Sequence, residues 1–189
     1  MKAVVLSRFG GPEELRLGDV ERPEPGPGQV RVRVRAAGVN PFDVKVRSGA
    51  MEAVFTTPLP TVLGSEVAGV VDAVGPGVTG TAVGDEVLGW ADTGAYAEYV
   101  LTTTFAPKPA GLTWERAVSL PVAVETTDRV LGLLDVEPGG TLLVHGAAGG
   151  VGVVAVQLAV AAGLRVIGTA GPDNQERVAA LGATPTTYG

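Results

Sequence analysis

Hydrophobic positions follow two different patterns along this chain of 189 residues. Over roughly the first 110 residues, short segments alternate apolar with polar residues, as a strand with one buried face requires. The clearest is segment 29–35, where Val30, Val32 and Val34 occupy one face and three arginines lie on the other. Clusters of proline and glycine separate these segments. The pattern predicts a β domain over residues 1–120, with the arginine face exposed to solvent.

From Thr113 the alternation of apolar and polar residues gives way to a pattern typical of helices. Thr113 is predicted to be the N-cap of the first of them. A longer helix is predicted over residues 122–134. These helices lead from the β domain into the last part of the chain.

That last part contains an unbroken apolar strand at 141–145, a glycine-rich turn, and an apolar helix that ends near Ala162. A second apolar strand follows at 164–169, then a helix at 173–181 and the start of a third strand. This order is that of βαβ units. It predicts the first part of a doubly wound parallel sheet, residues 121–189, in a chain of mixed fold class.

The turn "AAGGVG" resembles the dinucleotide-binding pattern G-x-G-x-x-G, with alanine in the first glycine position. The second glycine lets the backbone approach a pyrophosphate, and the third lets the helix pack closely on the strand. Amides at the helix start would carry the positive end of the helix dipole toward the phosphates. A glycine turn that serves packing alone is the alternative. The candidate cofactor-binding residues are Ala147, Ala148, Gly149, Gly150, Val151 and Gly152.

The end of the second strand bears on the choice of nucleotide, because NAD-binding proteins place an acidic residue there on the ribose. Here Thr169 and Ala170 are uncharged, while Thr169 and Asn174 could donate to a 2′-phosphate and Arg177 could supply charge. The sequence therefore favours NADPH. Asp173 is the residue that argues for NAD instead, since a shifted loop could place its carboxylate on the ribose. A role at the start of the next helix is favoured for it.

Charge and composition exclude several functions. The net charge of −6 and the pI near 4.8 argue against nucleic acid or an anionic membrane as a partner. With no cysteine, a zinc site built from cysteines is excluded, and His145 is the single histidine. We find no signal peptide and no apolar run of about 20 residues, which predicts a cytoplasmic protein with no membrane span.

Five segments in order resemble the medium-chain dehydrogenase/reductase superfamily, and within it the zinc-free quinone oxidoreductase-like branch. They are "AAGVNPFDVKVRSG", "LGSEVAGVV", "VGDEVLG", "AVSLPVAVETT" and "VHGAAGGVG". In the second segment, Ser65 stands where zinc-dependent relatives carry a histidine. The resemblance implies a GroES-like catalytic β domain over 1–120 and a partial Rossmann NADP-binding domain over 121–189. It also implies a small-molecule substrate and a candidate homodimer.

The resemblance further implies hydride transfer from NADPH to a quinone or an α,β-unsaturated carbonyl. Asn40 matches an asparagine near the nicotinamide and substrate, and Thr126 matches a threonine at the nicotinamide end. Both Asn40 and Lys45 could donate hydrogen bonds to the oxygen on which charge develops. Some members carry a tyrosine at the position of Lys45, and Asp128 stands where an aromatic residue is common.

Other interpretations remain open at this point. Glu66 is expected to anchor a buried network and Asp85 to bond its own turn, whereas a Ser65–His145 nucleophile is disfavoured. Only two complete strands of a six-strand domain are visible, so the chain is interpreted as a fragment or truncated product with an open apolar sheet edge. The alternative function is a catalytically inactive nucleotide-binding or interaction protein. A zinc alcohol dehydrogenase is disfavoured by composition.

Overall fold

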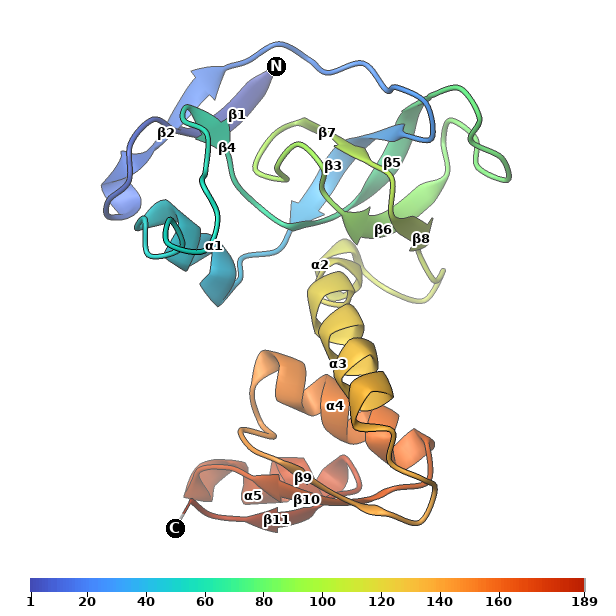
Figure 1. Ribbon diagram of the computed structural model, residues 1–189. Coiled ribbons are helices and arrows are strands. Elements are labelled where there is room, and N and C mark those ends of the chain that lie inside the picture. Colours follow the sequence, from blue (N-terminus) through green and yellow to red (C-terminus); the bar gives the residue numbers. More distant parts are fainter. Residues whose placement is uncertain (189) are drawn as a thin grey trace. The chain divides into compact units, whose positions relative to one another are not determined.

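The computed structural model describes residues 1–188, and the chain divides into two compact units, Met1–Pro121 and Val122–Gly189 (Figure 1). Each unit has its own hydrophobic core. Among residues 1–188, no helix is both long enough and apolar enough to cross a membrane.

The first unit is built on two antiparallel sheets with strand orders β2-β1-β4 and β7-β3-β5-β6-β8. Its strands are β1 (Lys2–Leu6), β2 (Leu15–Asp19), β3 (Val30–Ala37), β4 (Thr61–Val62), β5 (Glu66–Val74), β6 (Glu86–Trp90), β7 (Tyr99–Thr102) and β8 (Phe105–Pro107). Its helices are η1 (Pro12–Glu14), α1 (Pro41–Arg47) and α2 (Trp114–Val118). The predicted cap of α2 is confirmed, because the Thr113 side chain accepts from the Arg116 backbone N–H.

Strand β3 lies between β7 and β5 in the larger sheet, and one of its residues contradicts a prediction. Val30 and Val32 are fully buried, as the alternation predicts, but Arg31 between them is also buried, at 4% exposed. The pairing register with β5 shifts between Arg31 and Val32, where Asp72 of β5 is skipped. The Arg31 guanidinium forms ion pairs with Asp72 at 2.6 Å and Glu24 at 2.7 Å. The prediction of an exposed arginine face is therefore wrong at Arg31, although Arg33 and Arg35 are exposed.

The second unit has a parallel sheet with strand order β11-β10-β9. Its strands are β9 (Thr141–Val144), β10 (Arg165–Thr169) and β11 (Thr184–Thr186). Its helices are α3 (Pro121–Leu134, of which Pro121 belongs to the first unit), α4 (Gly150–Ala161), η2 (Pro172–Asn174) and α5 (Gln175–Ala180). The helix predicted over 173–181 is thus a 3-10 turn followed by a shorter α-helix, and Asp173 lies in that turn.

The core of this unit is formed by small and branched residues of α4, β10 and α5, including Val156, Val166 and Val178. Strand β9 pairs only with β10 among the described strands. Leu143 in β9 is 62% exposed, although β9 is apolar throughout its last three residues. The open apolar edge expected from the sequence is therefore present at β9.

Candidate functional site

The turn between β9 and α4 is tight and uses most of its first amides internally. Gly146 has φ 75°, the left-handed conformation that favours glycine. The Ala147 N–H donates to Thr169 O at 2.8 Å, and the Gly149 N–H donates to Gly146 O at 3.0 Å. The tight turn therefore uses Gly146 as its left-handed residue. Gly146 lies one position before Ala147, which was matched to the first glycine of the dinucleotide-binding pattern. The Ala147 amide is engaged with the sheet and cannot also bind a phosphate.

The amides that remain are those of the first turn of α4. Gly149 is the N-cap and its position provides no side-chain cap. Within residues 1–188, no backbone acceptor is paired with the N–H of Gly150, Val151 or Gly152, as expected for the first turn of a helix. Three donors and the positive end of a twelve-residue helix dipole therefore point at one place.

Small side chains keep this helix start accessible and closely packed. A Cβ atom added at Gly150 would have no heavy-atom neighbour within 4 Å, so the approach to its amide is open. A Cβ atom at Gly152 would instead collide with Gly146 O and the Ala147 backbone. Gly152 thus has the packing role predicted for the third glycine. The turn has the donors and the space that a dinucleotide pyrophosphate needs.

Thr169, expected to donate to a 2′-phosphate, is engaged within the protein. Its Oγ1 accepts from the Gly146 N–H at 3.0 Å and lies 2.9 Å from Nδ1 of His145. Thr169 is also buried. These contacts tie the end of β10 to the turn after β9. Thr169 therefore supports the turn between β9 and α4 from the end of β10. Its hydroxyl is engaged within the protein and is not free for a ligand.

Residues just beyond β10 are more accessible. Gln175 holds the backbone between β10 and the 3-10 turn η2. Its Nε2 donates to Ala170 O at 2.7 Å and to Gly171 O at 3.2 Å. Ala170 itself is fully buried. Arg177 is exposed, Asn174 is half-buried, and neither side chain makes a hydrogen bond or ion pair within residues 1–188. Gln175 was missed from the sequence, because nothing local distinguishes it from a solvated glutamine.

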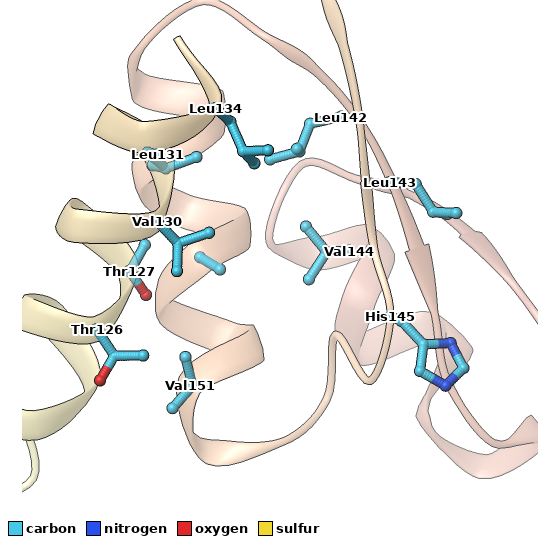
Figure 2. Close-up of a pocket in the computed structure, with 11 residues that line it drawn as sticks. Thr126, Thr127, Val130, Leu131, Leu134, Leu142, Leu143, Val144, His145 and Val151 are labelled. Carbon is cyan, nitrogen blue, oxygen red and sulfur yellow. The ribbon is translucent and has the colours of Figure 1, made fainter. Parts of the chain in front are cut away.

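Thr126 lies on α3 beside a groove of about 210 Å³ within the second unit. The groove is lined mainly by leucine and valine of α3, β9 and α4. Figure 2 shows Leu142 and Val144 pointing toward α3, whereas Leu143 and His145 project to the other side of β9. Thr127 is 2% exposed and its Oγ1 has no hydrogen-bond partner among the described residues. The surface beside Thr126 is therefore apolar, with threonine hydroxyls at one end.

The first unit brings together a separate polar cluster, composed of Asn40, Asp43, Ser65, Glu66 and Tyr96. Asn40 Nδ2 donates to Glu66 Oε1 at 2.9 Å, and the Asn40 backbone N–H donates to Asp43 Oδ2 at 2.8 Å. Ser65 Oγ donates to Asp43 Oδ1 at 3.2 Å. The buried network predicted for Glu66 is confirmed.

Burial shapes the chemistry of this cluster. Asp43 is 5% exposed and Glu66 is 4% exposed. Burial, together with the negative charges of Asp43 and Glu66, raises the pKa of the Tyr96 phenol well above its ordinary range. Tyr96 therefore stays protonated at neutral pH. Among residues 1–188, no three His, Cys, Asp or Glu side chains are arranged to hold a metal ion.

Two other predicted residues can be placed in the first unit. Lys45 is exposed on α1, and its ammonium makes no hydrogen bond or ion pair within residues 1–188. Asp85 Oδ2 accepts from the Ala82 backbone N–H at 2.8 Å, which confirms its role in a turn.

Comparison with known proteins places this architecture in a family. Residues 26–109 match the family described as the alcohol dehydrogenase GroES-like domain. The chain is 39% identical over 183 residues to a quinone oxidoreductase of Rattus norvegicus, covering 94% of the chain and 55% of that protein. It is 40% identical over 197 residues to the chloroplastic NADPH-dependent alkenal/one oxidoreductase of Arabidopsis thaliana, covering 97% of the chain and 51% of that protein.

The fold agrees with solved structures. A mycobacterial protein solved in complex with NADPH superposes with a TM-score of 0.89 at 37% identity, covering 100% of the chain and 59% of that protein. The chain spans about half the length of the curated relatives it matches.

A GroES-like β domain followed by the first part of a Rossmann α/β domain is the architecture of the medium-chain dehydrogenases and reductases. The chain belongs to that superfamily, in its quinone oxidoreductase-like branch.

Proposed function

We propose that this chain belongs to a zinc-independent reductase that transfers hydride from NADPH to a quinone or an α,β-unsaturated carbonyl. In this proposal residues 1–120 provide the catalytic domain and residues 121–189 the cofactor-binding domain. The observation that carries it is the uncapped start of α4, where the amides of Gly150, Val151 and Gly152 have no backbone acceptor and the space beside Gly150 is open. The relatives named as quinone and alkenal/one oxidoreductases support the substrate class.

In the second unit, the amides of the α4 start would hold the pyrophosphate. Ala148 and Gly149 contribute backbone without bulky side chains. Thr126 would lie toward the nicotinamide end, as the family resemblance implies. Thr169 and Ala147 act indirectly, by holding the turn in shape through their bonds to the sheet.

Selectivity for NADPH is assigned to Arg177 and Asn174. Neither side chain is engaged within the described chain, so both can turn toward a 2′-phosphate beyond β10. No acidic residue ends β10 itself, where an acid would disfavour that phosphate. Asp173, one residue before Asn174, is the group that would favour NADH instead.

In the first unit, Asn40 is proposed as the donor to the substrate oxygen and Lys45 as a second candidate. NADPH, held by the amides of the α4 start, would supply a hydride for the conjugated carbon of the substrate. An N–H donor of Asn40 or Lys45 would stabilise the negative charge that then develops on the carbonyl oxygen. A proton from water completes the reduction, so no dedicated acid is required.

The proposal is tested by titrating the protein with NADPH and NADH and by following NADPH consumption with a conjugated ketone or a quinone. We expect tighter binding of NADPH than NADH, and oxidation that depends on the acceptor. Binding without turnover in every acceptor would favour the alternative, a catalytically inactive nucleotide-binding protein. Absence of binding would contradict the proposal altogether.

A matched pair of variants tests the selectivity. Arg177→Gln is expected to weaken NADPH binding about tenfold or more, the value of a charge-assisted hydrogen bond, and to leave NADH binding unchanged. Arg165→Gln removes the same charge at the start of β10, where the guanidinium bonds Thr141 Oγ1, and should change neither affinity. Equal effects of both variants would show that Arg177 acts only through net charge.

A further inference from the structure

Asn40 is held at two points by two buried carboxylates from different parts of the first unit. Asp43, one turn into α1, accepts from the Asn40 backbone N–H at 2.8 Å. Glu66, at the start of β5 and 26 residues further along the chain, accepts from the Asn40 side chain at 2.9 Å. Together these contacts fix both the backbone and the amide group of a residue at the junction of β3 and α1.

The Glu66 contact selects one orientation of the Asn40 amide. The two ends of an amide group are nearly identical in shape but opposite in hydrogen bonding, since one is an NH₂ donor and the other a carbonyl acceptor. A carboxylate can only accept. If the amide were turned over, Oδ1 of Asn40 would face Oε1 of Glu66, and two acceptors would repel each other. The Asp43 backbone N–H faces the other end of the amide in the capping box of α1, so Glu66 and Asp43 together select which end of Asn40 carries the remaining N–H.

The surroundings of Glu66 hold its carboxylate in place. Glu66 is 4% exposed. A Cβ atom added at Gly38 would collide with the Glu66 carboxylate and its Cγ, so the side chain occupies the space that this glycine leaves. The Gly38 N–H also donates to the Glu66 carbonyl oxygen at 3.2 Å. The Glu66 carboxylate is thus itself confined by Gly38, the first residue of the β3–α1 connection.

We propose that Glu66 is a positioning residue for the reductase reaction: its carboxylate fixes the Asn40 amide so that its second N–H is presented to the substrate oxygen. This inference rests on the proposed function, in which Asn40 is the donor to that oxygen. In this proposal Glu66 influences the substrate oxygen through its contact with Asn40 and does not touch the substrate. The effect of losing its charge must therefore depend on whether Asn40 is present.

A double-mutant cycle tests this dependence. Asn40→Ala is expected to lower the kcat/KM for the conjugated acceptor about a hundredfold, the cost of one lost oxyanion donor. Glu66→Gln keeps the size of the side chain but can either donate or accept, so the Asn40 amide loses one of the two groups that select its orientation. We expect Glu66→Gln to lower kcat severalfold with an unchanged KM for NADPH, and to lower it clearly less when Asn40 is already alanine.

A second measurement needs no turnover. In nuclear magnetic resonance spectra of the free protein, one side-chain NH₂ proton of Asn40 should be shifted downfield by the carboxylate. Glu66→Gln should move that proton upfield. The control Glu98→Gln changes an exposed carboxylate that accepts from the Lys2 backbone N–H, and should leave the Asn40 signals unmoved.

The outcomes separate this inference from the proposed function. If the unmodified protein does not turn over any acceptor, the proposed function fails, whereas an Asn40 signal that responds to Glu66→Gln still supports the orientation. Turnover with independent, multiplicative effects of the two substitutions would overturn the positioning role. Faster turnover of Glu66→Gln, or Asn40 signals that ignore it, would overturn it as well.

Discussion

Gly152 offers the sharpest test of how the glycine turn is packed. A methyl group at this position would collide with Gly146 O and with the Ala147 backbone. These are main-chain atoms of a turn tied to β10, so they cannot move aside as a flexible side chain could. Overpacking of this kind costs about 1–3 kcal/mol. Alanine also favours a helix over glycine by about 1 kcal/mol. The expected net loss of stability in Gly152→Ala is therefore up to about 2 kcal/mol.

Gly150→Ala is the matched control, because a Cβ atom there meets no heavy atom within 4 Å. This variant should be as stable as the original protein or more stable by up to about 1 kcal/mol, from helix propensity alone. Urea unfolding of the two variants measures both effects, and their difference isolates the collision. The reasoning is refuted if Gly152→Ala proves as stable as Gly150→Ala.

Three further predictions concern residues whose roles came from the structure. Arg31→Met should lower the free energy of unfolding by about 2 kcal/mol. This is less than the ~3–5 kcal/mol of a fully buried ion pair that loses one partner, because the carboxylates of Glu24 and Asp72 keep contact with water. Arg33→Met, at an exposed position of the same strand, should change urea unfolding by less than about 0.5 kcal/mol, and equal losses would contradict the burial argument. Thr169→Val leaves the Gly146 N–H without its acceptor, so it should cost about 1–2 kcal/mol of stability. It should not alter the preference for NADPH over NADH. A changed preference would show that Thr169 does contact the 2′-phosphate, against the structural argument. The raised pKa of Tyr96 means that the folded state holds the phenol proton more tightly than the unfolded state does. Stability should therefore fall as the pH rises above about 10. Melting curves at several pH values should show that Tyr96→Phe removes this part of the fall.

The order of elements was accessible from the sequence because each element follows a local pattern. The strand, glycine turn and helix of residues 141–162 were predicted to within two residues, since an unbroken apolar run and a glycine cluster are signals carried by neighbouring positions. The N-cap at Thr113 was predicted for the same reason. Such features depend on spacing along the chain and not on distant partners.

Contacts between distant residues account for what the sequence did not predict. Thr169 was expected to be free for a phosphate, but its acceptor role toward Gly146, 23 residues away, exists only once the parallel strands pair. Arg31 was expected in solvent, but its guanidinium contacts Asp72, 41 residues away, and the segment of Pro23 and Glu24. The Asn40–Glu66 contact likewise joins residues 26 positions apart. Each needs the sheet to exist before the pair can form.

The central claim is that the start of α4 binds the phosphates of NADPH. It is tested most directly by following backbone amide signals in nuclear magnetic resonance spectra while NADPH is added to the protein. We predict saturable shifts that are largest at Gly150, Val151 and Gly152, whose N–H groups have no backbone acceptor within the described chain. Unchanged signals at these three amides with NADPH in large excess, or shifts confined to other residues, would contradict the account.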